Sequence, residues 1–365
     1  MTEHTRKMTS DQSAWHRIEN ALLDCGFQMP LFHRLAWATQ NPHRRYKHVA
    51  ITSADGTPLA QVAVQSDPSR VLPGHAFLRV VRFGENLPES VVEPMVVALK
   101  HFANKDRRAL RLSIGVFARR HRPRIAELLE RNGFQKSSEP QSYRHTLTID
   151  LQPTEADLLS GLHKTARRKL RDVEKAALHV ATLTDPVYAE RIGILQGETL
   201  THSGGVTERP DWRSILELSQ QNPELSRIVG LFSSADDLAS GGLLGFAWGA
   251  RHGDHVEYRA AGMTRVEGRN ISVGYPLMWA LILWAKQEGA AWFDMGGVTL
   301  PETPNDPLAG ISDFKRMFSQ VTEEVGEEWY LEPHPAKTRL ASLLGKGGRQ
   351  AASLLGKIQS RKGAA

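Results

Sequence analysis

Residues 275–297, YPLMWALILWAKQEGAAWFDMGG, place a long apolar segment directly before a short β-rich one. The apolar run from Tyr275 to Ala285 is shorter than the roughly 18 residues of a membrane-spanning helix. It predicts a buried helix over 275–287 that ends at Gly289, followed by a strand over 291–294. A buried helix that leads into a strand is typical of an α/β protein.

The chain before this segment continues the alternation of helices and strands. Gly253-Asp254 has the composition of a hairpin turn between two apolar runs. The elements expected between 189 and 263 are helices 189–201 and 212–220 and strands 228–233, 243–251 and 255–263.

The first half has a comparable pattern, which indicates one complete α/β domain. Asp55-Gly56 is an expected turn and Gly133 an expected helix end. The helices expected there are 15–23, 88–104 and 123–132, and the strands are 48–52, 59–65, 75–83, 110–116 and 143–151. Two similar halves predict a domain duplication, with domains at 15–152 and 153–334, a flexible N-terminus at 1–14 and a basic, flexible tail at 335–365.

Length and composition agree with two globular domains. The chain has 365 residues, of which 41% are hydrophobic and 24% charged. Its first residues lack the apolar run of a secretory signal, so we expect a cytoplasmic protein. The single cysteine, Cys25, rules out an intramolecular disulfide framework and is expected to be buried. The common phosphate-loop, zinc, serine-hydrolase and calcium motifs are absent, so we expect neither a metal nor a cofactor.

A candidate site follows the decisive segment. Asp294 lies at the C-terminal end of an expected strand, where α/β sheets place ligands, and Gly296-Gly297 allows a close approach. After a proline-rich loop, GISDFKRMF (310–318) predicts a short helix through Lys315. A lysine ammonium held in such a cleft can stabilise the oxyanion formed when an amine attacks an acyl group. The alternative is that Phe314 and Phe318 are core residues and Lys315 is solvated.

These motifs resemble the FemABX aminoacyltransferases. The pattern Gly310-x-x-x-Phe314-Lys315-x-x-Phe318 follows Phe293-Asp294-Met295-Gly296-Gly297, and Leu162-His163-x-x-x-Arg167-Arg168-x-Leu170-Arg171 is similar to that family's arginine-bearing helix. The resemblance covers about residues 30–333. Two places depart from the pattern: Ser319 replaces a glycine, and Trp37-Ala38-Thr39-Gln40 lacks a lysine by which some members bind precursor phosphates.

The resemblance implies two tandem acetyltransferase-like (GNAT) domains, each a mixed sheet flanked by helices, without the long coiled-coil insertion of some relatives. It implies an acyltransferase that moves an amino acid from aminoacyl-tRNA to an amine of a peptidoglycan precursor. Phe314 and Lys315 then correspond to the aromatic–lysine pair of the acyl-transfer centre. The expected substrate-binding residues are Arg167, Arg168, Arg171, Tyr258, Asp294, Gly296 and Gly297.

A basic helix is expected from Thr154, its N-cap, to about Ala177. Its apolar face is expected to hold Leu159, Leu162, Ala166, Leu170, Val173 and Ala177, and six basic residues lie between Lys164 and Lys175. They form either a phosphate-binding face for the tRNA or a solvated face partly neutralised by acids.

Other segments keep two further functions open. Arg265 to Asn270 resembles the pyrophosphate loop of acyl-CoA-dependent acetyltransferases, which makes Arg265, Gly268 and Asn270 candidate CoA contacts. The second hypothesis is therefore an acyl-CoA-dependent N-acyltransferase of exopolysaccharide or small-molecule biosynthesis. The third is a non-catalytic module that binds tRNA or another polyanion.

Two further features have open roles. Residues 335–365, with seven basic residues and no acid, predict either a mobile tail or an amphipathic helix that contacts a membrane or RNA. The histidines His163, His202 and His255 are general-base candidates by residue type, and the alternative is a surface or capping role.

Overall fold

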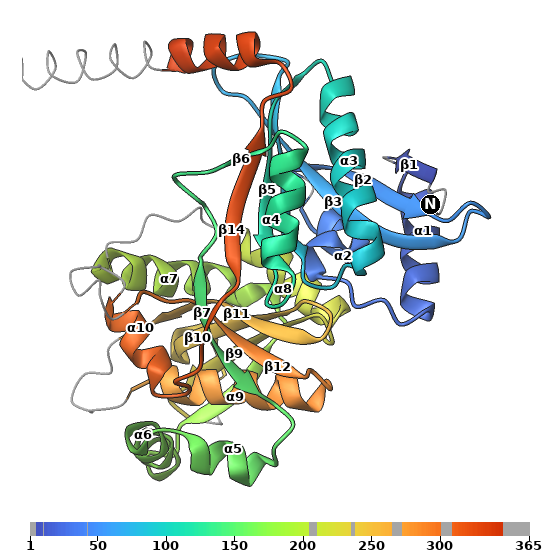
Figure 1. The fold of residues 1–365 in the computed structure, drawn as a ribbon. Coiled ribbons are helices and arrows are strands. Elements are labelled where there is room, and N and C mark those ends of the chain that lie inside the picture. The colour runs from blue at the N-terminus through green and yellow to red at the C-terminus, as the bar shows by residue number, and fades with distance from the viewer. Residues whose placement is uncertain are drawn as a thin grey trace, which may run out of the picture. The chain divides into compact units, whose positions relative to one another are not determined.

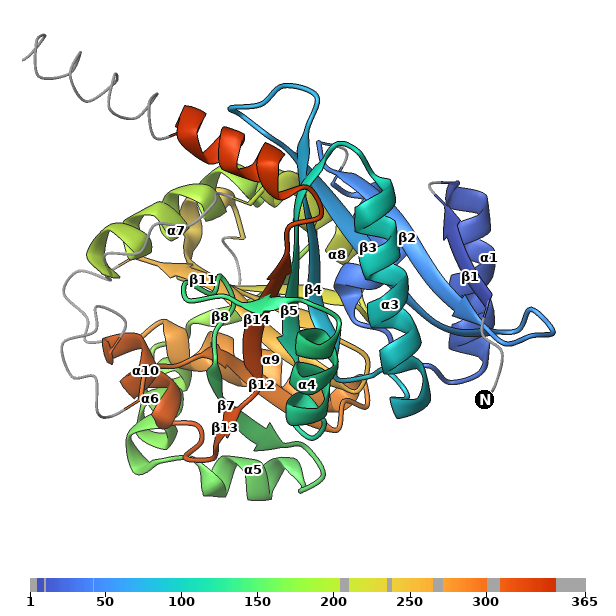
Figure 2. The same cartoon turned by 45° about the horizontal axis from the view of Figure 1, so that its top comes forward.

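The computed structural model describes residues 5–9, 11–41, 43–203, 210–234, 238–264, 272–300 and 309–345. The chain divides into two compact units, each built on a seven-stranded mixed sheet (Figures 1 and 2). The first unit is Met1–Ile18, His43–Gln141 and Glu327–Ala365, and the second is Glu19–Pro42 and Ser142–Gly326. The predicted α/β class, with two sheets flanked by helices, is confirmed.

The sheet of the first unit has the order β1-β2-β3-β4-β5-β14-β6. Strands β1 to β4 pair antiparallel, whereas β4 and β5 are parallel because helix α3 crosses between them. The strands are β1 (Thr5–Thr9), β2 (Arg45–Thr52), β3 (Pro58–Pro68), β4 (Ala76–Gly84), β5 (Ala109–Phe117), β6 (Gln135–Lys136) and β14 (Gly326–Leu331). The helices are α3 (Glu89–Lys105) and α4 (Arg122–Arg131), whereas α1 (Gln12–Asp24) is shared, because the division between the units falls after Ile18.

The sheet of the second unit has the order β13-β7-β12-β11-β10-β9-β8. It repeats the same arrangement, because β11 and β12 are parallel and helix α9 connects them. The strands are β7 (His145–Asp150), β8 (His179–Leu183), β9 (Ser226–Phe232), β10 (Leu243–Arg251), β11 (His255–Met263), β12 (Trp292–Gly297) and β13 (Thr322–Glu324). The helices are α2 (Leu35–Thr39), α5 (Glu155–Gly161), α6 (Lys164–Lys175), α7 (Ala189–Ser203), α8 (Trp212–Gln221), α9 (Gly274–Gln287) and α10 (Ala309–Arg316), with short 3-10 turns η1 (Leu31–His33), η2 (Pro186–Tyr188) and η3 (Ser240–Gly242).

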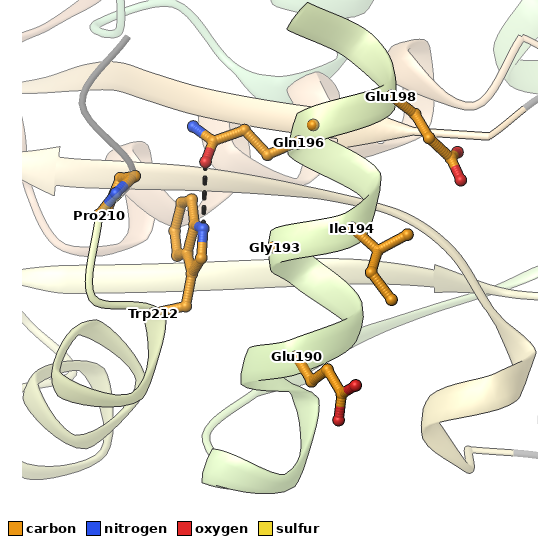
Figure 3. Close-up of a pocket in the computed structure, with 8 residues that line it drawn as sticks. Glu190, Gly193, Ile194, Gln196, Glu198, Pro210 and Trp212 are labelled. Carbon is orange, nitrogen blue, oxygen red and sulfur yellow. Dashed lines mark hydrogen bonds between the residues drawn. The ribbon is translucent and has the colours of Figure 1, made fainter. Parts of the chain in front are cut away.

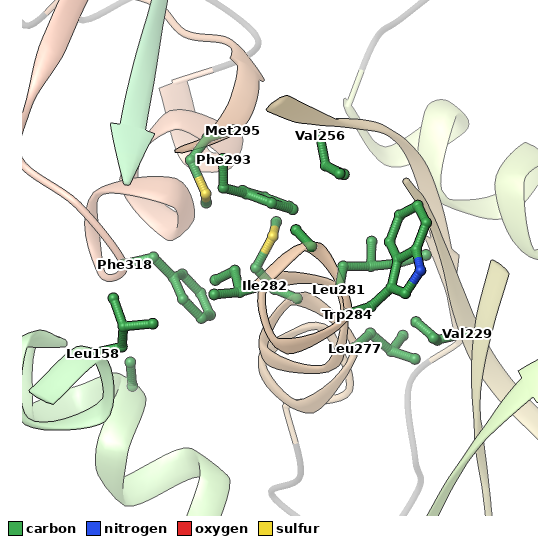
Figure 4. Packing of buried hydrophobic residues seen from close by; sticks show 14 of the residues in the cluster. Leu158, Val229, Val256, Leu277, Leu281, Ile282, Trp284, Phe293, Met295 and Phe318 are labelled. Atoms are coloured by element: carbon green, nitrogen blue, oxygen red, sulfur yellow. The ribbon is translucent and has the colours of Figure 1, made fainter. Parts of the chain in front are cut away.

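Alternating side chains of the second sheet enter two separate cores. Val229 and Leu231 of β9 face the core that contains α9, whereas Ile228 and Phe232 face the core that contains α7 and α8. Figure 4 shows the side chains of α9 between Phe318 on one side and the strands on the other. Because the whole apolar run of α9 is needed to fill this core, the predicted buried helix is confirmed.

The observed strand pairing corrects the expected assignment of strands to the two domains. The strand expected over 143–151, which we placed at the end of the first domain, lies in the second sheet as β7, between β12 and β13. The end of the chain returns instead to the first sheet as β14. The units are therefore interleaved along the chain rather than divided at residue 152, because strand pairing follows hydrogen-bonding edges and not sequence order.

Both chain ends also differ from the expectation of flexible segments. Residues 5–9 form β1, which pairs with β2 from Thr5↔Thr52 to Thr9↔His48. Residues 335–345 are helical, and residues 346–365 lie outside the described part. Cys25 is exposed rather than buried, since it follows the last residue of α1. Within the described residues, no helix combines the length and the apolar character needed to cross a membrane.

The long basic helix expected from Thr154 to Ala177 is two helices. Thr154 caps α5 as predicted, its hydroxyl accepting a hydrogen bond from the Asp157 N–H at 3.2 Å. Helix α5 ends at Gly161, and His163 caps α6 by accepting from the Thr165 N–H at 3.2 Å. The break turns Leu159 outward, so the apolar face is shorter than expected.

Gly262→Ala is expected to destabilise the second unit by at least about 2 kcal/mol. A Cβ at Gly262 would lie 2.5 Å from the Gln196 nitrogen and 2.6 Å from the Leu195 carbonyl carbon, both in the backbone of α7. Because backbone atoms cannot turn away as a side chain does, α7 must move off β11. Denaturant unfolding measures the change. Gly197→Ala on α7 is the control: it has open space and is expected to raise stability by up to about 1 kcal/mol.

Candidate functional site

Strands β11 and β12 separate in the middle of the second sheet. Their parallel register ends at Glu257↔Asp294, although β11 continues to Met263 and β12 to Gly297. On its other edge β12 is bulged, because Asp294 pairs with Thr148 but Gly297 pairs with Thr146. The separation opens a place between two strands in which a side chain from elsewhere can enter.

Gly296 lies at this bulge with a φ of 72°, a conformation that favours glycine. A Cβ there would lie 2.8 Å from the Tyr258 carbonyl oxygen and 3.4 Å from Lys315 Nζ. A Cβ at Gly297 would lie 2.7 Å from that of Tyr143. A larger residue at Gly296 would push against β11 and Lys315, and one at Gly297 would displace the Tyr143 side chain.

Lys315 enters this opening from the last turn of α10. Its side chain is only 5% exposed, and Nζ donates a hydrogen bond to the Gly297 carbonyl at 2.7 Å and lies 5.5 Å from the Tyr258 ring centre. Burial lowers the pKa of Lys315 to about 8, while the charges of Asp294 and Glu257 act in the opposite direction. The interpretation of Lys315 as a solvated side chain is wrong.

Aromatic rings form the wall beside this lysine. Phe314 packs edge-on against Tyr275 at 5.1 Å and against Phe318 at 5.4 Å between ring centres. Tyr258 is partly buried, and burial raises the pKa of its hydroxyl because the phenolate would lose hydration. Because Lys315 is buried, little water screens its charge, which strengthens any electrostatic interaction that it makes.

Two fully buried carboxylates lie next to Lys315. Glu257 and Asp294 are register partners, and the Tyr143 hydroxyl lies 2.9 Å from Glu257 Oε1 and 2.6 Å from Asp294 Oδ2. A phenol has one hydrogen, so it donates to one carboxylate at a time. Tyr143 therefore connects the two carboxylates through a single hydroxyl group.

Further donors hold the carboxylates in place. Thr146 Oγ1 and the Gly296 N–H bond Asp294 Oδ1 at 2.5 and 2.9 Å. Arg259 donates to Glu257 Oε1 at 3.1 Å, and His252 Nε2 lies 3.0 Å from Glu257 Oε2. The sequence reasoning missed Glu257, Tyr143, Thr146, His252 and Arg259. A charge inside the apolar run of β11 was the available signal for Glu257.

The three arginines of α6 have different surroundings. Arg167 donates to the Ser160 carbonyl and so joins α6 to α5. Arg168 and Arg171 are exposed on the opposite side from the buried Ala166, Leu170 and Val173. Helix α6 begins beside α10, because the His163 N–H bonds the Met317 carbonyl at 3.0 Å.

The remaining sequence candidates are dispersed. Arg265, Gly268 and Asn270 lie outside the described residues, as does the side chain of His202. His255 is buried, stacked on Trp292, with Nδ1 2.8 Å from Asp254 Oδ1. Of the positions that depart from the family pattern, Ser319 donates to the Thr148 carbonyl at 2.6 Å and Gln40 to Gln221 at 2.9 Å.

A cavity of about 440 Å³ lies along α7 (Figure 3). Trp212 Nε1 donates to Gln196 Oε1 across it at 3.2 Å. The residues that line it are Glu190, Gly193, Ile194, Gln196, Gly197, Glu198, Pro210 and Trp212. None of them belongs to the set around Lys315, so this cavity does not identify the centre of an acyl transfer.

Comparison with known proteins shows which folds this chain resembles. Residues 160–316 match the acetyltransferase (GNAT) domain family. Over 93% of this chain and all of the other, the structure is similar to that of FemX, with 14% sequence identity and a TM-score of 0.72. It is also similar to a tandem GNAT protein from the clavulanic acid biosynthesis pathway, with 15% identity, a TM-score of 0.50 and coverage of 91% of this chain and 99% of the other. No curated protein sequence matches the chain. The expected FemABX-like, tandem GNAT fold is confirmed.

Proposed function

Because residues 160–316 match the acetyltransferase (GNAT) domain family and the fold is similar to that of FemX, we propose that the protein transfers an aminoacyl group from aminoacyl-tRNA to an amine acceptor. A peptidoglycan precursor is the acceptor class that the family resemblance suggests. The observation that carries the proposal is Lys315, a buried ammonium held between two separating strands beside a pair of carboxylates.

In the proposed reaction the acceptor amine attacks the ester carbonyl of the donor. A C–N bond forms, the C–O bond to the tRNA ribose breaks, and negative charge develops on the carbonyl oxygen. The Lys315 ammonium, leaving the Gly297 carbonyl, stabilises that oxyanion in a site shielded from water. Glu257 and Asp294, linked by Tyr143, take the proton that the amine loses and return it to the leaving ribose oxygen.

The donor is tested with purified full-length protein, a mixture of charged tRNAs, a panel of acyl-CoA thioesters and peptidoglycan precursors, with products identified by mass spectrometry. The proposal expects products that disappear when RNase is added. If products still form after RNase treatment and require acyl-CoA, the proposal is wrong and the second hypothesis, an acyl-CoA-dependent N-acyltransferase, takes its place. That hypothesis is supported by the sequence of residues 265–270, which lie shortly before the first residue of α9, Gly274.

Transfer is expected to weaken as the pH rises through about 8. The ammonium form of Lys315 predominates below its pKa of about 8, so kcat/KM should fall about tenfold for each further pH unit. Titration of the acceptor amine is common to all variants and cancels in a comparison with Lys315→Arg. The arginine variant stays charged, so its residual activity should lack this decrease. A native rate that rises relative to the arginine variant above pH 8 would mean that the neutral amine is the active form.

Replacing both Arg168 and Arg171 by glutamate should weaken tRNA binding about tenfold. The slope of log affinity against log salt concentration should also become shallower, by the amount that about two phosphate contacts contribute. Both side chains are exposed, so the fold should persist. Affinity measured over a series of salt concentrations gives both quantities. Arg213→Glu on α8 is the matched exposed control and should change neither. Equal losses in both variants would indicate a general charge effect rather than a contact by α6.

A further inference from the structure

A group of exposed leucines lies on the helical segment 335–345, at the red end of the chain in Figures 1 and 2. Leu340, Leu343 and Leu344 are 48%, 67% and 48% exposed, and their spacing places them on one helix face. Val71, also exposed, lies beside Gly345 in the same unit. We name these four side chains the leucine patch. They make up four of the ten exposed large apolar side chains among the described residues.

The opposite face of this segment is attached to the first unit. Ala341 is buried, and the Thr338 hydroxyl donates to the Leu110 carbonyl at 2.6 Å. Lys337 Nζ donates to the Arg107 carbonyl at 2.6 Å, and His334 Nε2 lies 3.3 Å from the Asp106 carbonyl. The leucines thus project from a docked helix, and their exposure has no local structural cause.

Positive charge surrounds the leucine patch. On the helix, Lys337 and Arg339 flank the leucine face on either side, as the 100° step between residues requires. Arg70 precedes Val71, and Arg107 lies beneath Lys337. Of the acids nearby, Asp106 pairs with Lys47 at 3.5 Å and Glu332 with Arg111 at 2.8 Å. Residues 346–365 add five basic residues and no acid to the sequence.

We propose that the leucine patch and its basic border bind an anionic phospholipid surface. The leucines enter the boundary between headgroups and acyl chains, and the arginines and lysines contact the headgroup phosphates. RNA would account for the cations but not for three leucines exposed on one face of a docked helix. The proposal does not depend on the reaction that the second unit performs.

The test uses the full-length protein with vesicles of phosphatidylcholine alone and of an equimolar mixture with phosphatidylglycerol. Flotation should give at least about tenfold tighter binding to the mixed vesicles, and added salt should weaken it. Leu340→Ser with Leu343→Ser should weaken binding to the mixed vesicles by about tenfold or more. Both residues are exposed, so thermal unfolding should be unchanged.

Leu159→Ser with Val321→Ser is the matched control, since both residues are exposed and apolar but lie in the second unit. It should bind vesicles as the native protein does. Failure of the native protein to bind mixed vesicles, or equal losses in the two double variants, would overturn the proposal. The proposal would also be overturned if Arg339→Ala weakened binding of RNA while Leu340→Ser with Leu343→Ser left vesicle binding unchanged. The surface would then recognise RNA.

Discussion

Lys315→Met is expected to reduce kcat/KM for transfer by about a hundredfold to a thousandfold while the protein stays folded. The ammonium lies between the separated strands β11 and β12, and in the proposed reaction it faces the developing oxyanion. Methionine keeps most of the side-chain volume and removes only the charge and its hydrogen bond. Because the loss concerns the transition state, kcat should fall with little change in KM.

Lys286→Met is the matched control for this variant. Lys286 lies on α9 in the same unit, and its Nζ also donates to a backbone carbonyl, that of Leu151, at 2.9 Å. It contacts neither of the paired carboxylates. If the two methionine variants lose activity equally, or if Lys315→Met unfolds, Lys315 is a structural residue. Near-native activity of folded Lys315→Met would remove the proposed oxyanion role.

Glu257→Gln should lower the rate of transfer about a hundredfold, by removing a proton acceptor from the pair that Tyr143 links. Glutamine preserves the shape and still accepts a hydrogen bond from Arg259, so the position of β11 should not change. The decrease should be largest in pre-steady-state measurements of the chemical step. It should also be smaller for an acceptor of lower amine pKa, which gives up its proton more easily.

A buried glutamate of the first unit provides the control for Glu257→Gln. Glu327 accepts from Lys136 at 2.6 Å and from Trp329 Nε1 at 3.0 Å. Glu327→Gln should lower stability through its ion pair without a specific effect on the chemical step. A hundredfold loss in Glu327→Gln with unchanged stability would show that the effect of Glu257→Gln does not report proton transfer.

Helices and strands with a clear period were predictable from the sequence. The expected strands 243–251 and 255–263 coincide with β10 and β11, because the Gly253-Asp254 turn separates two apolar runs. The helix of 275–287 differs from α9 by one residue. The basic helix was not predicted correctly. Its apolar spacing continues across Leu162 and His163, whereas in the structure His163 caps a new helix and its N–H bonds the Met317 carbonyl.

The candidate site was predictable in part. Asp294, Gly296, Phe314 and Lys315 stand near one another in a recognisable order, and Tyr258 was also among the expected residues. Tyr143 and Thr146 were not, since nothing local marks a residue more than a hundred positions away as a partner of Asp294. His252 and Arg259 have side chains of ordinary surface type and gain a role only through Glu257.

The sequence by itself determined the elements, the α/β class and the family-like order of motifs, because periodicity, turn residues and caps act over a few residues. Only the tertiary structure decided that β7 and β14 lie in different sheets and that β11 and β12 separate after Glu257 and Asp294. It also decided the state of Lys315. Burial between two strands lowers the pKa of an ordinary lysine to about 8, although Asp294 and Glu257 act against this shift, and that environment is assembled from residues far apart in the chain.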